Sequence, residues 1–305
     1  MNETIIDIAK SSYFDRQLIG AYRSHIYSLI VDNIREALDH LILVILAYLV
    51  LCFGTYHLIF RRFAKRFHLI NDIRLAQYRR VLIVTAHPDD ECMFFGPTIL
   101  SLTQRREPCT VYLLCLSNGN FEQLGNIRKH ELYDATRVLR LKDEHITLMN
   151  STLLADDPNL NWKTELVAKQ IRKEVETLDI EALITFDRDG VSYHPNHCTI
   201  YYAAASLCLA GYLPKNCKIL TLDSVNVLRK YMSVFDLVIS LLLSTNWCIL
   251  SWTNVNIVRK AMRQHRSQML WFRKLYIVFS RYMVINTLRQ IDVSDIELDM
   301  QINDT

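Results

Sequence analysis

A run of twenty uncharged residues constrains this chain more than any other feature of its sequence. Residues 41–60, LILVILAYLVLCFGTYHLIF, contain no Asp, Glu, Lys or Arg. At roughly 1.5 Å of rise per residue, a helix of this length covers the hydrocarbon core of a bilayer, which is about 30 Å thick. The run therefore predicts one transmembrane helix. A buried core helix is the alternative, but such long uncharged runs are rare in soluble folds.

The charges on either side of this run predict its orientation. Residues 61–80 carry seven basic side chains and one acidic side chain, whereas residues 1–40 carry four basic and six acidic ones. Because the more positive flank stays in the cytosol, we expect a short lumenal segment at 1–40, a basic juxtamembrane linker at 61–80 and a cytosolic domain after it. The eight cysteines show no CxxC spacing, which agrees with reduced thiols in the cytosol.

Beyond residue 80 the sequence alternates between strand and helix patterns. Expected strands lie at 81–86, 110–116, 145–150, 181–186 and 218–222, and expected helices at 92–106, 126–141, 162–178 and 196–210. This alternation predicts an α/β fold in which helices cover both faces of a mostly parallel sheet. Ligands of such sheets bind at the carboxyl ends of the strands, so the polar residues after the first and fourth strands should form a site.

The C-terminal third has a different composition. We expect residues 234–285 to form a membrane-proximal helical part of a domain spanning 81–290, followed by a polar tail at 291–305. Residues 237–258 are uncharged but hold eight Ser, Thr or Asn. A second crossing here would force the basic segment that follows into the lumen, so a helix at the interface or packed on the domain is expected instead.

The basic residues after position 258 alternate with aromatic residues and could contact anionic lipid headgroups. A solvated basic face over an aromatic core stripe is the alternative. No nucleic-acid partner is expected, because no binding motif accompanies the positive charge. The sequence does not predict an oligomeric state.

Two polar motifs follow the first and fourth expected strands. The first contains His87 and Asp90, three residues apart, and the second is HPNH at 194–197. If the two loops converge, His87, Asp90 and His197 form a nitrogen and oxygen ligand set that suits hydrolytic zinc with one coordination position left for water.

Two further side chains of these motifs, Asp89 and His194, remain free for proton transfer. A carboxylate such as that of Asp89 can take a proton from an attacking water, and an imidazole such as that of His194 can face a developing oxyanion. Taken singly, each motif has a simpler explanation, since a histidine at a strand end is commonly structural and Asp-Asp-Glu commonly begins a helix. Their occurrence together at matching strand ends favours a site.

Other chemistries fit these residues less well. A two-metal phosphoryl site built from the available carboxylates would leave the paired histidines without a role. Dinucleotide binding is not expected, because no GxGxxG motif follows a strand. No Ser or Cys stands on a nucleophile elbow motif.

Several motifs together resemble those of the LmbE-like, or PIG-L, family of zinc N-deacetylases. They are AHPDDE at 86–91, LSNGN at 116–120, RKHEL at 128–132, TFDRDGVSYHPNH at 185–197, RKY at 229–231 and AMRQHRSQMLWFRKLYIVFSRYM at 261–283. The last block and the N-terminal membrane helix resemble the eukaryotic branch of the family, which acts on N-acetylglucosaminyl-phosphatidylinositol. The similarity extends from about residue 80 to residue 285.

The resemblance implies a Rossmann-like, LmbE-like fold and a set of residue roles. His87, Asp90 and His197 would hold Zn2+, or another divalent metal. Asp89 would be the general base, and His194 would stabilise the oxyanion or help to protonate the leaving amine. Asn196 stands where the wider family commonly has an acidic residue, so we expect Asp187 or Asp189 to orient His194.

The resemblance also implies a substrate and a location. The substrate would be GlcNAc-phosphatidylinositol, deacetylated at the cytosolic face of the endoplasmic reticulum membrane in the second step of GPI-anchor biosynthesis. Arg128 and Arg266 would meet its phosphate. A deacetylase of another GlcNAc conjugate and a catalytically silent membrane scaffold of the same fold are the alternatives, although an inactive relative would be expected to lack one of the five site residues.

Overall fold

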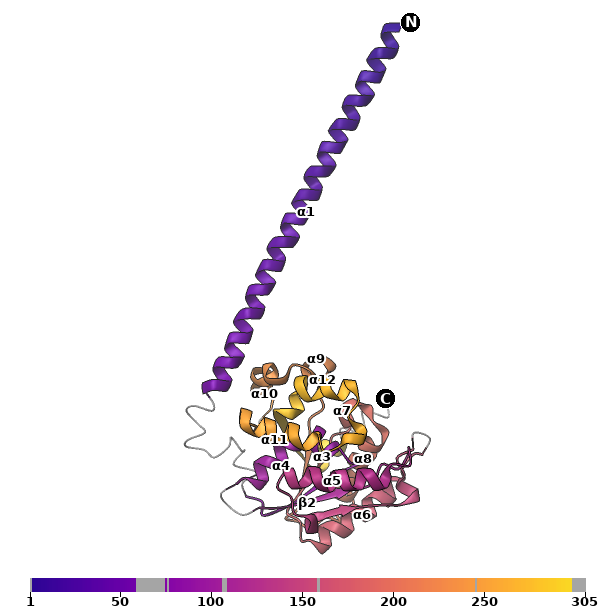
Figure 1. Cartoon of the computed structure of the whole chain (residues 1–305), viewed down its shortest axis with the longest axis vertical. Coiled ribbons are helices and arrows are strands. Elements are labelled where there is room, and N and C mark those ends of the chain that lie inside the picture. Colours follow the sequence, from indigo (N-terminus) through magenta and orange to yellow (C-terminus); the bar gives the residue numbers. More distant parts are fainter. Residues whose placement is uncertain are drawn as a thin grey trace. The chain divides into compact units, whose positions relative to one another are not determined.

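The structure is a computed structural model that describes residues 2–58, 75, 77–105, 109–157, 160–244 and 246–297. It contains two compact units, Met1–Leu51 and Cys52–Thr305. The first unit consists of most of α1, a continuous helix over Asn2–Leu58, and the second contains a sheet and its surrounding helices (Figure 1). Most of the expected juxtamembrane linker and the end of the expected polar tail lie outside the described residues.

The long helix α1 contains the expected membrane segment as far as Leu58. Its apolar part, Ile30–Leu58, has a mean hydropathy of 2.3 over the best window, and 6% of that window is buried. Within the described ranges it is the one helix long and apolar enough to span a membrane. Its length and composition therefore agree with the predicted anchor.

The second unit is built around a seven-stranded sheet with the order β3-β2-β1-β4-β5-β7-β6. The strands are β1 (Arg80–Thr85), β2 (Thr110–Cys115), β3 (Ile146–Leu148), β4 (Ala182–Phe186), β5 (Lys218–Leu222), β6 (Trp247–Ile249) and β7 (Ile285–Ile291). The first five are parallel and coincide with the five expected strands, which confirms the α/β prediction. Residues Val81–Val84 of β1 are almost fully buried, as a central parallel strand requires.

Helices connect these strands. They are α3 (Asp90–Met93), α4 (Gly96–Thr103), α5 (Gly125–Val138), α6 (Thr164–Thr177), α7 (Gly190–Tyr193), α8 (Pro195–Leu209), α9 (Val227–Lys230), α10 (Leu237–Leu243), α11 (Trp252–Met262) and α12 (Trp271–Phe279). Short 3-10 turns are η2 (Asp143–His145), η3 (Thr152–Leu154), η4 (Ser233–Asp236), η5 (Arg266–Gln268) and η6 (Arg281–Met283). Because parallel crossovers are right-handed, α4 and α5 cover one face of the sheet and α6 and α8 the other.

Residues 237–258 differ from the expectation of one helix. They form α10, strand β6 and most of α11. Strand β6 pairs with β7, and β7 pairs antiparallel with β5, so the C-terminal segment completes the sheet. The physical reason is local: α10 ends at Leu243 because Ser244 is extended, and the hydroxyl of Ser251 accepts a hydrogen bond from Asn254 N to begin α11. A three-residue strand is too short to show a periodic pattern.

Candidate active site

The first site loop lies between the end of β1 and the start of α3. Asp90 begins α3, and its Oδ2 accepts hydrogen bonds from the backbone nitrogens of Ala86 (3.0 Å) and His87 (2.9 Å). Asp89, the preceding residue, has a φ of 122°, a conformation that residues with a side chain rarely adopt. The loop therefore holds the Asp90 carboxylate in one position at the carboxyl end of the central strand.

The second site loop lies between β4 and α8. Gly190 has a φ of 53°, and a Cβ at this position would lie 2.8 Å from the Cβ of His197. The carbonyl of Gly190 accepts a hydrogen bond from Nδ1 of His197 at 3.1 Å. The His197 ring stacks on Phe186, with ring centroids 3.9 Å apart and planes 2° from parallel. These contacts orient Nε2 of His197 away from the backbone and leave its lone pair free.

The two loops converge, as their positions at neighbouring strand ends predict. Nε2 of His197 lies 3.3 Å from Oδ2 of Asp90, and Nδ1 of His87 lies 3.9 Å from the same oxygen. A ring nitrogen from each of His87, His194 and His197 lies within 4.8 Å of the others. The structure thus brings together His87, Asp90, His194 and His197, with His194 as a further donor beside the three expected ligands.

This donor set fits a zinc-like ion. Two ligand atoms that each lie about 2.0–2.2 Å from a tetrahedral metal are roughly 3.3–3.6 Å apart, close to the two distances measured to Asp90. Nε2 of His197 is buried and, among the described residues, has no hydrogen-bond partner. A buried nitrogen with a free lone pair next to a carboxylate is what a divalent metal would satisfy.

The protonation states of these groups also suit metal binding. Burial lowers the pKa of His87, which favours the neutral imidazole. Burial alone would raise the pKa of Asp90, but the neighbouring His197 and His87 hold it below its usual value, so the carboxylate is ionised. Neutral imidazoles and an ionised carboxylate are the forms that bind metal.

The rings of His87, His194 and His197 form a triangle, with those of His87 and His197 5.8 Å apart. The ring of His194 is 4.6 Å from that of His197 and 5.0 Å from that of His87. Burial, followed by the influence of His197 and His87, lowers the pKa of His194 to about 4. The side chain is therefore neutral at physiological pH and carries one N–H.

We expected Asp187 or Asp189 to orient His194, but Asp187 is engaged by other groups and Asp189 lies against Arg188. Oδ1 of Asp187 accepts hydrogen bonds from the Ser224 hydroxyl (2.5 Å) and from Gly190 N (3.1 Å), and Oδ2 accepts one from Ser224 N (2.6 Å). These bonds fix the loop after β4 rather than the imidazole. Within the described part of the chain, Nδ1 of His194 is buried without a hydrogen-bond partner.

Asp156 is a site residue that the sequence analysis missed. Its Oδ1 lies 3.3 Å from Nε2 of His87, and its Oδ2 accepts a hydrogen bond from Arg128 at 3.2 Å. A carboxylate on the outer nitrogen of a histidine is the usual support of a metal-binding imidazole, because it directs the other nitrogen toward the metal. Asp156 stands in a loop between predicted elements, where no motif marks it. The same contact places Arg128 beside the cluster.

The segment 265–268 supports the first site loop. Nε2 of His265 lies 2.6 Å from Oε1 of Glu91, both side chains being fully buried. Oε2 of Glu91 accepts a hydrogen bond from the backbone nitrogen of Asp89 at 2.9 Å, and Gln268 donates one to Pro88 O at 2.7 Å. The neighbouring Arg266 is exposed, and no contact with another described residue places it at the cluster.

Arg273 on α12 is a second residue that the sequence analysis missed. Its guanidinium forms an ion pair with the carboxylate of Asp89 and also contacts the sulfur of Met93. The C-terminal block therefore reaches the site directly as well as through His265.

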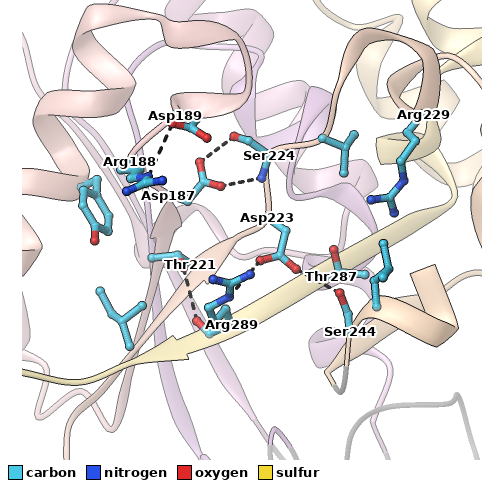
Figure 2. Close-up of a pocket in the computed structure, with 14 residues that line it drawn as sticks. Asp187, Arg188, Asp189, Thr221, Asp223, Ser224, Arg229, Ser244, Thr287 and Arg289 are labelled. Carbon is cyan, nitrogen blue, oxygen red and sulfur yellow. Dashed lines mark hydrogen bonds and ion pairs between the residues drawn. The ribbon is translucent and has the colours of Figure 1, made fainter. Parts of the chain in front are cut away.

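A polar pocket lies beside the second site loop. Its volume is about 430 Å³, and it contains the carboxylates of Asp187, Asp189 and Asp223 together with the guanidinium groups of Arg188 and Arg289 (Figure 2). Such a mixture of donors and acceptors suits a hydroxyl-rich or phosphorylated ligand.

Fold and site together define a hydrolase of the deacetylase class, in which two histidine-bearing loops meet at adjacent ends of a parallel sheet. The family model described as "GlcNAc-PI de-N-acetylase" (PIG-L) matches residues 82–208. The N-acetylglucosaminyl-phosphatidylinositol de-N-acetylase of Bos taurus is 45% identical over 210 residues, covering 68% of this chain and 82% of the relative. A probable enzyme of the same name from Schizosaccharomyces pombe is 38% identical, covering 69% and 86%. The chain belongs to the GlcNAc-PI de-N-acetylase family.

A solved structure supports the fold. The N,N'-diacetylchitobiose deacetylase from Pyrococcus horikoshii superposes with a TM-score of 0.54 at 18% identity, covering 79% of this chain and 93% of its own. The LmbE-like sheet expected from the motifs is therefore confirmed.

Proposed function

We propose that this enzyme hydrolyses the N-acetyl group of N-acetylglucosaminyl-phosphatidylinositol, giving glucosaminyl-phosphatidylinositol and acetate, the second step of GPI-anchor biosynthesis. The observation that carries the proposal is the meeting of His87, Asp90 and His197 at adjacent strand ends. The 45% identity to a relative named for this substrate supports the choice of lipid.

In this proposal, His87, Asp90 and His197 hold Zn2+ or another divalent metal. Asp156 lies next to Nε2 of His87 and orients the imidazole. The metal would supply Lewis acidity at the acetamide carbonyl and acidify a water. His197 keeps its lone pair toward the metal position because its other nitrogen donates to Gly190.

Asp89 is the proposed general base. It takes a proton from the attacking water as the water oxygen bonds to the acetamide carbon, and the proton is then passed to the amine as the carbon–nitrogen bond breaks. Its backbone nitrogen is fixed by Glu91 and its carboxylate by Arg273. The neutral His194 can donate its N–H to the oxyanion or help to deliver the amine proton.

The polar groups around the cluster would bind the head of the lipid. Arg128 lies beside the cluster through Asp156 and can meet an anionic oxygen. The pocket at Asp187, Asp189 and Asp223 offers acceptors to sugar or inositol hydroxyls. Arg266 is exposed, so it would contact the phosphate only at the outer edge of the candidate active site.

We infer that the enzyme is a single-pass protein of the endoplasmic reticulum membrane with its catalytic domain in the cytoplasm. In this arrangement residues 1–40 are lumenal, 41–60 span the membrane and 81–290 form the deacetylase domain. Support comes from the apolar stretch Ile30–Leu58 and from the basic residues that follow it.

The test is acetate release from GlcNAc-phosphatidylinositol by the full chain in detergent, before and after chelation and zinc readdition. We expect chelation to abolish release and zinc to restore it. Release from other acetylated sugars but not from this lipid would favour a different GlcNAc conjugate. No release from a folded, zinc-loaded sample would favour a silent scaffold.

A further inference from the structure

Helix α12 is apolar on both of its long faces. Tyr276 and Ile277 are buried against the domain, as in any packed helix. On the opposite face Trp271, Leu275 and Phe279 recur at four-residue spacing and are 73%, 49% and 50% exposed. Packing within the domain explains why Tyr276 and Ile277 are apolar. The exposed apolar face has no packing partner among the described residues.

Helices α9 and α10 extend the same exposed surface. Leu228 of α9 is 76% exposed and Leu242 of α10 is 80% exposed. The ring of Tyr231, directly after α9, lies 6.3 Å from that of Tyr276 in α12, and η4 joins α9 to α10. Figure 1 shows α9, α10 and α12 together on one side of the globular unit. Apolar side chains exposed over several adjacent helices mark an interaction site rather than scattered surface residues.

Buried ion pairs hold this surface in place. Asp236 of η4, which is fully buried, pairs with Arg229 of α9 (2.7 Å) and with the buried Arg281 that follows α12 (2.8 Å). The helices carrying the apolar side chains are therefore tied to one another, and the outward orientation of those side chains is a property of the fold.

The charge around this surface identifies its partner. From Ser251 to Ile291 the chain holds eight Arg or Lys and no acidic residue. Of these, Lys274 is exposed within α12, Arg266 is exposed five residues before α12 begins, and Arg263 is exposed at the end of α11. Apolar and aromatic side chains bordered by basic ones fit a bilayer with anionic headgroups. The apolar stretch Ile30–Leu58 of the same chain would keep the domain near such a bilayer.

We propose that α9, α10 and α12 form a bilayer-binding surface, which inserts its outer side chains among the headgroups and upper acyl chains of the adjacent leaflet. A cavity of about 450 Å³ lies beside this surface, between α7 and α9, and is lined in part by Tyr193, Val227 and Tyr231. A lipid headgroup entering there reaches the loop that carries His194 without leaving the membrane surface. The ion pair between Arg273 and Asp89 connects α12, which is part of this bilayer-binding surface, with the candidate active site.

Fluorescence of a reporter dye tests the insertion. The full chain is labelled with the polarity-sensitive dye NBD at Leu242→Cys or at Leu275→Cys and reconstituted into phosphatidylcholine–phosphatidylserine vesicles. Lys173→Cys on α6, which lies on the other side of the globular unit in Figure 1, is the matched control. The unsubstituted chain, labelled in parallel, gives the background from native thiols.

We expect a several-fold rise in fluorescence at positions 242 and 275 but not at 173, and quenching by nitroxide-bearing lipids. Labels at 242 and 275 that behave like the control would overturn the proposal. A rise that lipid nitroxides do not quench would also overturn it, because a protein partner or a second copy would then cover the surface.

A kinetic experiment, which rests on the proposed function, measures the consequence for catalysis. Combining Leu242→Glu with Leu275→Glu should raise the KM for vesicle-borne GlcNAc-phosphatidylinositol by about tenfold or more, because both variants replace an apolar side chain that the bilayer would bury with a charged one. The kcat and the activity on a water-soluble head-group analogue should not change. An unchanged KM would contradict the proposal. If the wild-type chain releases no acetate from either substrate, the proposed function fails, whereas the fluorescence result still decides the surface.

Discussion

The two loops that follow β1 and β4 and the C-terminal segment from α11 to β7 contribute to one site in different ways. The loops supply the proposed reacting side chains as short motifs, with His87, Asp89 and Asp90 in four consecutive positions. The C-terminal segment contributes His265 and Arg273, each of which contacts a residue more than 170 positions away. The proposed reacting residues therefore lie close together in the sequence, whereas the residues that hold them in place come from distant positions and meet them only in the folded chain.

Replacing a proposed metal ligand should have the largest effect. Asp90→Asn removes the negative charge between His87 and His197, so we expect loss of bound metal and of measurable acetate release. Metal content by elemental analysis and turnover are measured on the same folded sample. Full metal occupancy in the variant would show that His194 takes the place of Asp90 in the ligand set.

Asp89→Asn should separate catalysis from metal binding. The amide cannot accept the proton, so we expect turnover to fall by about 10²–10⁴-fold with the metal retained. Pre-steady-state acetate release and metal content decide the result. Loss of metal would mean that the roles of Asp89 and Asp90 are exchanged.

His265→Ala tests the support given by the C-terminal segment. The substitution leaves Glu91 buried without its partner, and we expect a loss of about 3–5 kcal/mol in the free energy of unfolding. Thermal unfolding of the full chain in detergent measures it, with Gln264→Ala, a half-buried neighbour, as the control. Equal stability of the two variants would mean that the Glu91–His265 contact only accompanies the loop geometry.

Asp156→Asn should have the smallest effect. It removes the carboxylate behind His87, and we expect metal affinity to fall by about 10–100-fold, as for other supporting residues of metal sites. Competition with a fluorescent chelator gives the affinity, and Asp157→Asn is the neighbouring control. Unchanged affinity would show that Asp156 does not set the orientation of the imidazole. Asn196 cannot replace it, because its amide nitrogen, 3.0 Å from Nε2 of His87, is a donor and not an acceptor.

The sequence predicts the parallel part of the sheet well, because β1, β2, β4 and β5 are mostly buried apolar runs in a chain segment that alternates with helices. It does not predict β6 and β7. Strand β6 has three residues, and β7 pairs antiparallel with β5, a strand more than 60 positions earlier. The apolar residues of β7, Ile285, Leu288 and Ile291, recur every three positions, which is neither an apolar run nor the alternation of a strand.

The same distinction applies to the site. His87, Asp90, His194 and His197 were predictable because each lies in a motif at a strand end, where parallel sheets bind ligands. Asp156 and Arg273 were not, since an aspartate in a loop and an arginine on an aromatic helix look like ordinary surface residues. Asn196 was noted as a departure from the family, but its contact with His87 depends on the folded loop.

The position of β7 has a consequence for biosynthesis. β7 lies between β5 and β6, so until the ribosome has produced residues 285–291, β5 remains an open edge of an unfinished parallel sheet. The apolar stretch at 30–58 emerges far earlier. If this apolar stretch enters the membrane before β7 is synthesised, the unfinished domain is held beside the bilayer while the edge of β5 is unpaired. Such an exposed strand edge is prone to aggregation. Chaperones that bind extended segments would be needed during that interval, and chains that end before β7 should be degraded rather than accumulate as inactive enzyme.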